Sequence, residues 1–509
     1  MKKILWVDDE IDLLKPHILF LKDKGYEVKT AFNGVDALDL LEQEKFDLVM
    51  LDENMPGLSG LETLNRITRS NPEIPVIMIT KSEEEDLMEQ AIGKSIADYL
   101  IKPVNPNQIL HSLKKILGSR DLVTSQNNID YREDFTRIEL LINSAVSVKD
   151  WEDIYKRLTY WNLKLDNNEM YDLLVQQNKE ADKGFSKFIK NNYIDWFNGS
   201  NSFFFSHELF KQRVFPLLDK GEKVCFILID NFRYDLWKKI QPLLTDTFDI
   251  SEEMYLSILP TSTQYARNSV FSGLMPLQIS ELYPDYWTDE NDEEGFNNHE
   301  EELFRFLLER FRRKEKFTYH KLQDSVSEIK YLSKINDLRE VPLNIVVMNF
   351  IDMISHARTE SKMIKELANS DSAYRSLTES WFRHSSIKEI LVKFAREGYK
   401  IILTTDHGTI RVSNPVKVIG EKSTNTNLRY KKGRNLKYNL KQVFEIKDPH
   451  KAGLPSNNIS DAYIFACNED FFVYPNNYNH HVQHYSGTFQ HGGVSMEEMM
   501  VPLITLILK

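Results

Sequence analysis

The chain has 509 residues, of which 41% are hydrophobic and 28% are charged. This length and composition are typical of a water-soluble protein of several domains, and no apolar run approaches the length of a membrane span. The formal net charge of -12 argues against a protein whose whole surface binds nucleic acid.

The start of the chain and its cysteines indicate a cytoplasmic protein. The first residues, MKKILWVDDEID, place acids inside the first apolar stretch and offer no small-residue cleavage site, so we expect no signal peptide. Cys225 and Cys467 lie in apolar runs, which is typical of buried thiols in a reducing compartment. We therefore expect no membrane insertion.

Residues 1–118 alternate apolar strands with amphipathic helices. The expected strands are KKILWVD, YEVKTA, FDLVMLD, PVIMIT and ADYLIK, and the expected helices lie near 12–24, 35–44, 61–70, 84–93 and 107–117. Five such units predict an α/β domain with a parallel, doubly wound sheet, whose binding crevice lies at the carboxyl ends of the strands.

Polar residues gather at those strand ends, namely Asp8, Asp9, Asp52, Thr80 and Lys102. Three neighbouring carboxylates repel one another, so the site needs a cation, and Mg²⁺ is the hard ion that oxygen ligands suit. Asp52 would accept a phosphoryl group, Lys102 would pair with it, and the Thr80 hydroxyl would bond to it.

These residues, together with MPGLSGLE after Asp52 and Tyr99 at an aromatic switch position, resemble a two-component receiver domain over residues 1–118. The resemblance implies phosphorylation of Asp52 by a sensor histidine kinase, and homodimerisation through the face that contains Tyr99. The alternative is a flavodoxin-like domain with incidental acids.

Residues 119–202 contain no strand-like run and no motif. Apolar residues at helical spacing predict two to four packed helices that couple the receiver to an effector. Buried helical faces explain the pattern, and a surface for a regulatory protein partner is the alternative.

Residues 203–509 predict a second α/β domain with a large central sheet. Strands are expected at 223–229, 248–252, 254–259, 316–322, 345–350, 400–405, 462–467, 471–474 and 503–507, and helices near 206–218, 233–239, 301–311, 361–369 and 373–397.

Metal-ligating residue types follow several of these strands, namely Asp230, Asp352, His356, Asp406, His407 and His491. Three Asp and three His suit two adjacent zinc ions, which predicts a bimetallic ester hydrolase. Two alternatives stay open. Asp352 and His356 have the spacing of a helix-surface pair, and His480, His481 and His484 compete with His491.

A hydroxyl nucleophile is offered by Thr261, Ser262 or Thr263, and it needs a nearby cation to lose its proton at neutral pH. One turn later, Arg267 or Asn268 could donate to the nonbridging oxygens of a phosphate. Arg267 could equally form a structural salt bridge.

The order of these motifs, PTST with SGLMP, DMISH, DHG and HGG before an acidic pair, resembles the alkaline phosphatase superfamily over residues 223–509. The resemblance implies that Thr263 is the nucleophile. It also implies one metal among Asp230, Thr263, Asp406 and His407, and a second among Asp352, His356 and His491.

The C-terminal pattern HGGxSxEEMxVP is most similar to the PglZ branch of that superfamily. The whole chain resembles PorX-type response regulators. This resemblance implies a zinc phosphodiesterase that acts on nucleotide or oligonucleotide substrates and a link to type IX secretion. A phosphomonoesterase of the same superfamily and a non-catalytic, metal-stabilised scaffold are the alternatives.

The stretch NLRYKKGRNLK at 427–437 is basic within an acidic chain. We expect a loop near the metals that holds a polyanion while Tyr430 stacks on a base. A solvated loop explains the composition as well. The residues concerned are Arg429, Tyr430, Lys431, Lys432 and Arg434.

Overall fold

The computed structural model describes residues 2–71, 73–80, 96–165, 170–199, 201–287, 298–353, 370–421, 424–425, 427–456, 458, 460–476 and 478–509. The chain forms two compact units, Met1–Glu133 and Asp134–Lys509. Within the described ranges, no helix is both long enough and apolar enough to cross a membrane.

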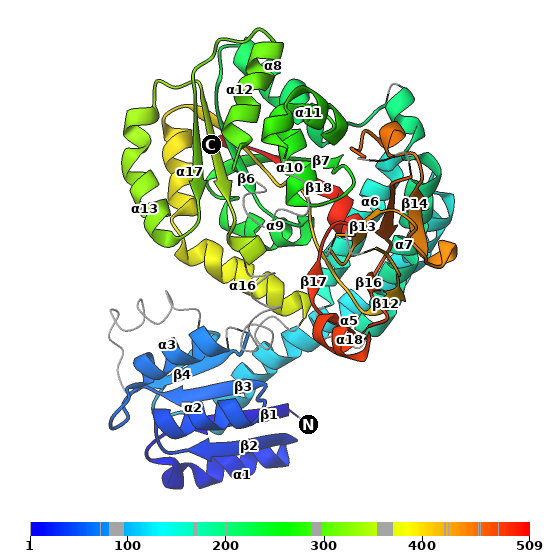
Figure 1. Ribbon diagram of the computed structural model, residues 1–509. Coiled ribbons are helices and arrows are strands. Elements are labelled where there is room, and N and C mark those ends of the chain that lie inside the picture. The colour runs from blue at the N-terminus through cyan, green and yellow to red at the C-terminus, as the bar shows by residue number, and fades with distance from the viewer. Residues whose placement is uncertain are drawn as a thin grey trace. The chain divides into compact units, whose positions relative to one another are not determined.

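The first unit contains the predicted parallel sheet, in the order β2-β1-β3-β4-β5 (Figure 1). All four strand pairings are parallel, which confirms the predicted fold. The strands are β1 (Lys2–Val7), β2 (Tyr26–Ala31), β3 (Leu48–Asp52), β4 (Val76–Thr80) and β5 (Asp98–Ile101).

Three helices follow the early strands at the predicted places: α1 (Lys15–Asp23), α2 (Gly34–Gln43) and α3 (Gly60–Ser70). Helix α3 begins at a capping box, in which Ser59 and Glu62 satisfy each other's backbone N–H groups. The helix predicted near 84–93 lies outside the described residues.

The last predicted receiver helix is much longer than expected. Helix α5 (Pro106–Ser144) has 39 residues, so the domain boundary predicted at residue 118 lies inside it. The sequence near 118 contains no proline and only one glycine, so nothing in it forces a helix to stop.

The second unit begins with the predicted helical segment. Helices α6 (Val148–Lys164) and α7 (Tyr171–Asn192) pack their apolar faces together, with the rings of Trp151 and Phe185 at 5.7 Å. They also contact the C-terminal part of the chain, because the hydroxyl of Tyr193 accepts the Leu259 N–H at 2.8 Å.

A six-stranded sheet forms the centre of this unit, in the order β7-β18-β10-β6-β9-β8 (Figure 1). Strands β10, β6, β9 and β8 are parallel to one another, whereas β18 is antiparallel to β10 and β7. The strands are β6 (Lys223–Ile229), β7 (Phe248–Leu256), β8 (Phe317–Leu322), β9 (Leu343–Met348), β10 (Tyr399–Thr404) and β18 (Met500–Leu508).

The helices of this unit are α8 (Phe215–Asp219), α9 (Tyr234–Ile240), α10 (Thr263–Ser272), α11 (Pro276–Leu282), α12 (Glu300–Arg310), α13 (Ser325–Lys334), α16 (Asp371–His384), α17 (Ile387–Arg396), α18 (Tyr478–Tyr485) and α19 (Met496–Met499). Smaller sheets contain β11 (Ile410–Arg411), β12 (Asn414–Lys417), β13 (Tyr430–Gly433), β14 (Val443–Ile446), β15 (Ala462–Ala466), β16 (Asp470–Val473) and β17 (Phe489–Gln490).

Four predicted elements differ from the structure, and the helix predicted near 361–369 lies outside the described residues. The strands predicted at 248–252 and 254–259 are one strand, β7. The helix predicted at 373–397 is broken into α16 and α17 around Ser385 and Ser386, whose side chains favour helix ends. The segment predicted as one helix near 206–218 combines two short helical turns with α8, where Pro216 allows a new start.

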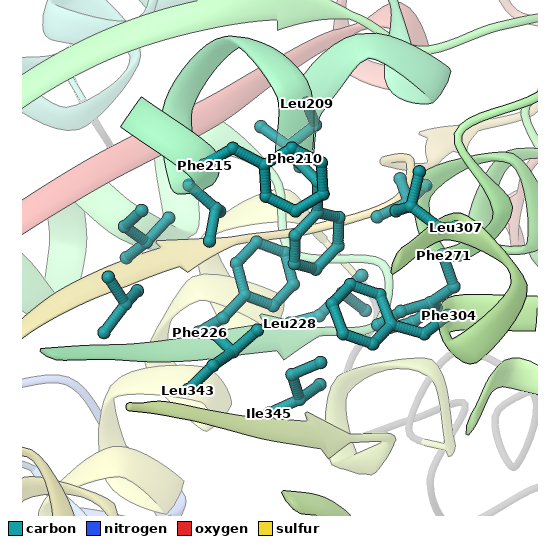
Figure 2. Close-up of a cluster of buried hydrophobic side chains, with 14 of the residues drawn as sticks. Leu209, Phe210, Phe215, Phe226, Leu228, Phe271, Phe304, Leu307, Leu343 and Ile345 are labelled. Atoms are coloured by element: carbon teal, nitrogen blue, oxygen red, sulfur yellow. The ribbon is translucent and has the colours of Figure 1, made fainter. Parts of the chain in front are cut away.

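One face of the sheet is covered by a core rich in phenylalanine (Figure 2). The ring of Phe210 lies 4.6 Å from that of Phe226 on β6 and 4.7 Å from that of Phe304 on α12. Replacing one fully buried phenylalanine by alanine lowers the free energy of unfolding by about 3–5 kcal/mol. This packing fixes α12 and β6, and with them the strand end at Asp230.

Candidate functional site

Five segments next to strand ends meet at one edge of the six-stranded sheet. Because β6, β9 and β10 are parallel, the residues after them, Asp230, Asp352 and Asp406, come at the same edge. Strand β18 runs in the opposite direction, so His491, which precedes it, belongs to this edge too. Strand β7 pairs with β18 and leads to Thr263.

The first predicted metal group is assembled around His407. Ligand atoms of Asp230, Asp406 and His407 lie within 4.8 Å of one another. His407 Nε2 is 3.8 Å from Asp230 Oδ1 and 3.1 Å from Thr263 Oγ1. Asp230 Oδ1 is buried and accepts no hydrogen bond from any described residue. A buried, unbonded carboxylate oxygen beside an imidazole fits a metal ion, and this donor mixture suits zinc.

Buried charge dominates the electrostatics of this group. Burial raises the pKa of Asp230 well above its ordinary value, although the Arg267 guanidinium acts against the shift. Burial also acts to raise the pKa of Asp406, but Arg267 and His407 together hold that pKa down at about 2. The two carboxylates therefore depend on nearby positive charge to stay ionised.

The second predicted metal group is described in part. His491 Nε2 lies 3.8 Å from Asp352 Oδ1, and the rings of His491 and His407 stack with centroids 4.4 Å apart. The two predicted groups are therefore neighbours. His356 lies outside the described residues.

The three candidate hydroxyls have different surroundings. Thr261 Oγ1 donates to the Gly493 carbonyl at 2.9 Å and accepts the Gly492 N–H at 3.1 Å. Ser262 Oγ is buried without a hydrogen-bond partner among the described residues. Thr263 is the first residue of α10, and its hydroxyl contacts His407. A helix N-terminus favours an anion beside it.

Arg267 has the salt-bridge environment that the sequence left open as an alternative. It is fully buried on α10, and its guanidinium is ion-paired with Asp230 and, at 2.9 Å, with Asp406. Glu300 lies 3.8 Å away on α12. The arginine thus offsets the negative charge of the two carboxylates that are predicted to bind metal. Asn268 beside it is buried, and its Oδ1 has no hydrogen-bond partner among the described residues.

The basic stretch differs from the predicted loop. Tyr430–Gly433 is strand β13, paired with β15. Arg429 is fully buried and forms an ion pair of 2.6 Å with Glu498, so it cannot reach a polyanion. Lys431 is also buried and donates to the Asn425 carbonyl.

The rest of this stretch divides between the interior and the surface. Tyr430 is buried against Tyr265, with ring centroids 5.8 Å apart. Lys432 is partly buried. Arg434 is exposed and lies 4.0 Å from Asp461.

Two site residues were missed from the sequence. Asn231 follows Asp230 with φ of +62°, and its amide donates to Asp352 at 3.4 Å, which links the two metal groups. Asparagine tolerates this left-handed backbone, and that preference is the signal that could have identified it. Glu498 is buried and accepts the Gly493 N–H behind His491.

The structure brings together four of the residues predicted for the receiver site, Asp8, Asp9, Asp52 and Lys102. Ligand atoms of Asp8, Asp9 and Asp52 lie within 4.8 Å of one another. Lys102 Nζ is 2.8 Å from Asp8 and 3.0 Å from Asp52. Burial raises the pKa of Asp52, and the charge of Asp8 adds to this, while Lys102 acts against both. Clustered carboxylates of this kind fit Mg²⁺.

The two other predicted receiver residues lie on neighbouring strands. Thr80 ends β4 and is buried, and Tyr99 is a partly buried residue of β5.

Three family models match the chain in succession. They are the response regulator receiver domain at residues 4–114, the PorX response regulator linker domain at 121–197, and the BREX system PglZ alkaline phosphatase-like domain at 209–506. The last of these covers more than half of the chain.

Similar proteins match over shorter lengths. The transcriptional regulatory protein CpxR homolog of Haemophilus influenzae is 34% identical over 169 residues, which cover 32% of this chain and 71% of that protein. The transcriptional regulatory protein ZraR of Klebsiella oxytoca is 36% identical over 122 residues, covering 24% and 28%. A CheY-like receiver domain structure from Methanospirillum hungatei JF-1 has 30% identity and a TM-score of 0.23, and the match covers 24% of this chain and 97% of that one.

A receiver domain followed by an alkaline phosphatase-like domain defines a two-component response regulator, and its phosphodonor is a sensor kinase. The chain belongs to the PorX-type response regulators that carry a PglZ domain.

Proposed function

We propose that the PglZ domain is a zinc-dependent phosphodiesterase acting on nucleotide or oligonucleotide phosphodiesters. The observation that carries this proposal is the meeting of Thr263 Oγ1, His407 Nε2 and the unbonded Asp230 Oδ1 at one sheet edge. A hydroxyl, an imidazole and carboxylates at this spacing are what hydrolysis of a phosphate ester at a metal centre requires.

The roles of the protein groups follow from their positions. Bound zinc would supply positive charge that lowers the pKa of a hydroxyl and offsets charge on phosphate. Thr263 Oγ1 would form the bond to phosphorus while the bond to the departing ester oxygen breaks, and water would then release the phosphoryl group. His407 Nε2 and the Thr263 hydroxyl lie close enough to hold the same ion, and the N-terminus of α10 favours the phosphate. Arg267 pairs with Asp230 and Asp406 and offsets their negative charge.

In the same proposal, the chain is a cytoplasmic regulator of type IX secretion. A sensor histidine kinase phosphorylates Asp52, and phosphorylation promotes a homodimer through the face with Tyr99 and changes the diesterase rate. The ion pairs that join Lys102 to Asp8 and Asp52 support this role, because a phosphoryl group on Asp52 would compete for the same lysine.

The test measures hydrolysis of bis-p-nitrophenyl phosphate and of p-nitrophenyl phosphate by the zinc-loaded full chain. We expect the diester to be cleaved faster, and we expect Thr263→Val to lower that rate roughly a thousandfold or more with zinc content unchanged. Ser262→Ala is the matched control, since it removes the neighbouring hydroxyl, and it should keep most of the activity. Repeating the assay with beryllofluoride, with and without Asp52→Asn, tests the regulation.

Other outcomes would identify the alternatives. Faster cleavage of the monoester would favour a phosphomonoesterase that uses the same residues. Cleavage of neither ester by protein with full zinc content would leave the metal-stabilised scaffold.

A further inference from the structure

A cavity of about 400 Å³ lies between the middle helices and the PglZ domain, and none of the predicted metal ligands lines it. Helices α6 and α7 form one wall, and the start of α9, helix α16, strand β11 and Glu497 of α19 form the other. All these elements belong to the unit Asp134–Lys509. The volume is that of a small-molecule site.

Apart from Arg411, which donates to the Gly487 carbonyl at 3.3 Å, the cations that line this cavity have anionic partners among the described residues. Arg233 is buried and pairs with Asp235 at 2.6 Å and with Asp371 at 2.9 Å. Arg375 is buried as well and lies 3.4 Å from Asp235. Lys179 pairs with Glu469 at 3.2 Å. These ion pairs offset the positive charge of Arg233, Arg375 and Lys179 at the cavity wall.

Two carboxyl groups of the lining have no such cation. Asp182 of α7 is buried and accepts one hydrogen bond, from the Met496 N–H at 3.1 Å. Glu497 Oε2 is buried, and no described residue donates a hydrogen bond to it. Among the described residues, neither carboxyl forms an ion pair within 4 Å. Burial raises the pKa of both groups, and the charge of Asp182 adds to the effect on Glu497.

A buried tyrosine hydroxyl lines the same cavity. Tyr155 of α6 is only 4% exposed, and its hydroxyl has no hydrogen-bond partner in the part of the chain that the structure describes. Tyr155, Asp182 and Glu497 all line this one cavity. An unbonded buried hydroxyl beside two carboxyl groups without cations destabilises a protein unless something binds there.

We propose that this cavity binds a small organic cation whose ammonium or guanidinium group donates to Asp182 and Glu497 and to the Tyr155 hydroxyl oxygen. Such a group would offset the charge of the two carboxylates and supply the missing donors. Since the middle helices and the PglZ domain both contribute ligands, binding would also stabilise their contact. This site is separate from the proposed diesterase and stands whether or not an ester is cleaved.

The test is isothermal titration of the full chain with putrescine, spermidine and arginine. We expect saturable binding of at least one of them, and none of 1,4-butanediol, which matches putrescine in length without its charge. If none of the three organic cations binds at millimolar concentration, the proposal fails. Binding of Mg²⁺ or Ca²⁺ in their place, lost in Asp182→Asn, would overturn the class of ligand.

Variants locate the binding. Asp182→Asn and Glu497→Gln should each weaken binding about tenfold or more, because each removes a charge-assisted hydrogen bond. Tyr155→Phe should weaken it a few-fold. Glu340→Gln, whose side chain is 89% exposed, is the matched control and should leave the affinity unchanged.

A second readout separates a binding role from a structural one. Without ligand, the Tm of Asp182→Asn, Glu497→Gln and Tyr155→Phe should stay the same or rise, since each replaces a poorly satisfied buried group. If the double variant of Asp182 and Glu497 binds as tightly as the wild type, the site lies elsewhere and the proposal is overturned.

Discussion

At the scale of single residues, protonation of Asp182 makes the free energy of unfolding depend on pH. Burial raises the pKa of its carboxyl from 3.8 to about 7 in the folded chain. The folded chain therefore keeps a proton that the unfolded chain releases as the pH rises above about 4, and the free energy of unfolding falls between about pH 4 and pH 7. The charged groups that act on Asp182 include Glu469 and Glu498, which raise its pKa, and Arg429, which lowers it.

We expect Asp182→Asn to flatten this dependence. In urea unfolding of the full chain between pH 5 and pH 8, the variant should lose less stability than the wild type as the pH rises. Glu340→Gln should keep the wild-type slope. An equal slope in Asp182→Asn would mean that another group takes up the proton.

The sequence predicted residue types at the site better than it predicted their contacts. Asp230, Asp406 and His407 could be identified because polar residues that follow parallel strands must come to one edge. Whether Arg267 faces a phosphate or the carboxylates depends on the turn of α10, which spacing alone does not reveal. Arg429 was misassigned because a basic stretch is normally solvated, and its buried partner, Glu498, lies 69 residues further along the chain.

At the scale of one element, helix α10 carries both the predicted nucleophile and the positive charge that balances the predicted metal-binding carboxylates. Removing the buried cation in Arg267→Met leaves Asp230 and Asp406 without their partner. We expect a loss of about 3–5 kcal/mol in the free energy of unfolding when zinc is removed with EDTA. Zinc should restore part of this loss, because it neutralises the same carboxylates.

Arg267→Lys is the matched control, since it keeps the charge, and it should lose less stability in EDTA. Urea unfolding with EDTA and with zinc measures both effects. If Arg267→Met is as stable as the wild type in EDTA, the guanidinium is not what offsets the buried acids.

Elements were predicted well where the pattern is local. Alternation of strands and helices was sufficient for both sheets, because their strands are apolar and bounded by charge. The ends of elements were less certain. Residues 252–254 read Glu-Glu-Met, and the charge suggested a break, yet β7 is paired with β18 along its whole length and continues through it.

At the scale of the whole molecule, the middle helices belong physically to the PglZ domain. The ring of Tyr155 lies 5.9 Å from that of Tyr234, and Ser186 donates to Asn468 at 2.9 Å. We expect a shortened chain of residues 134–509 to fold and unfold cooperatively. A chain of 203–509 should aggregate or melt at lower temperature, because it exposes the surface that α6 and α7 cover.

Size-exclusion chromatography and thermal unfolding by circular dichroism compare the two shortened chains. Equal Tm values for both would contradict this expectation and would support 203–509 as an independent domain, the boundary that the sequence predicts.

Strand β18 is synthesised long after β7, a strand with which it pairs. This strand, Met500–Leu508, lies between β7 and β10, and in the part of the chain that the structure describes it is the only strand of the sheet paired with β7. During synthesis, β7 leaves the ribosome about 250 residues before β18, so its edge stays unpaired for most of translation of the domain. His491 is made only shortly before β18, so the second predicted metal group cannot assemble until synthesis is nearly complete.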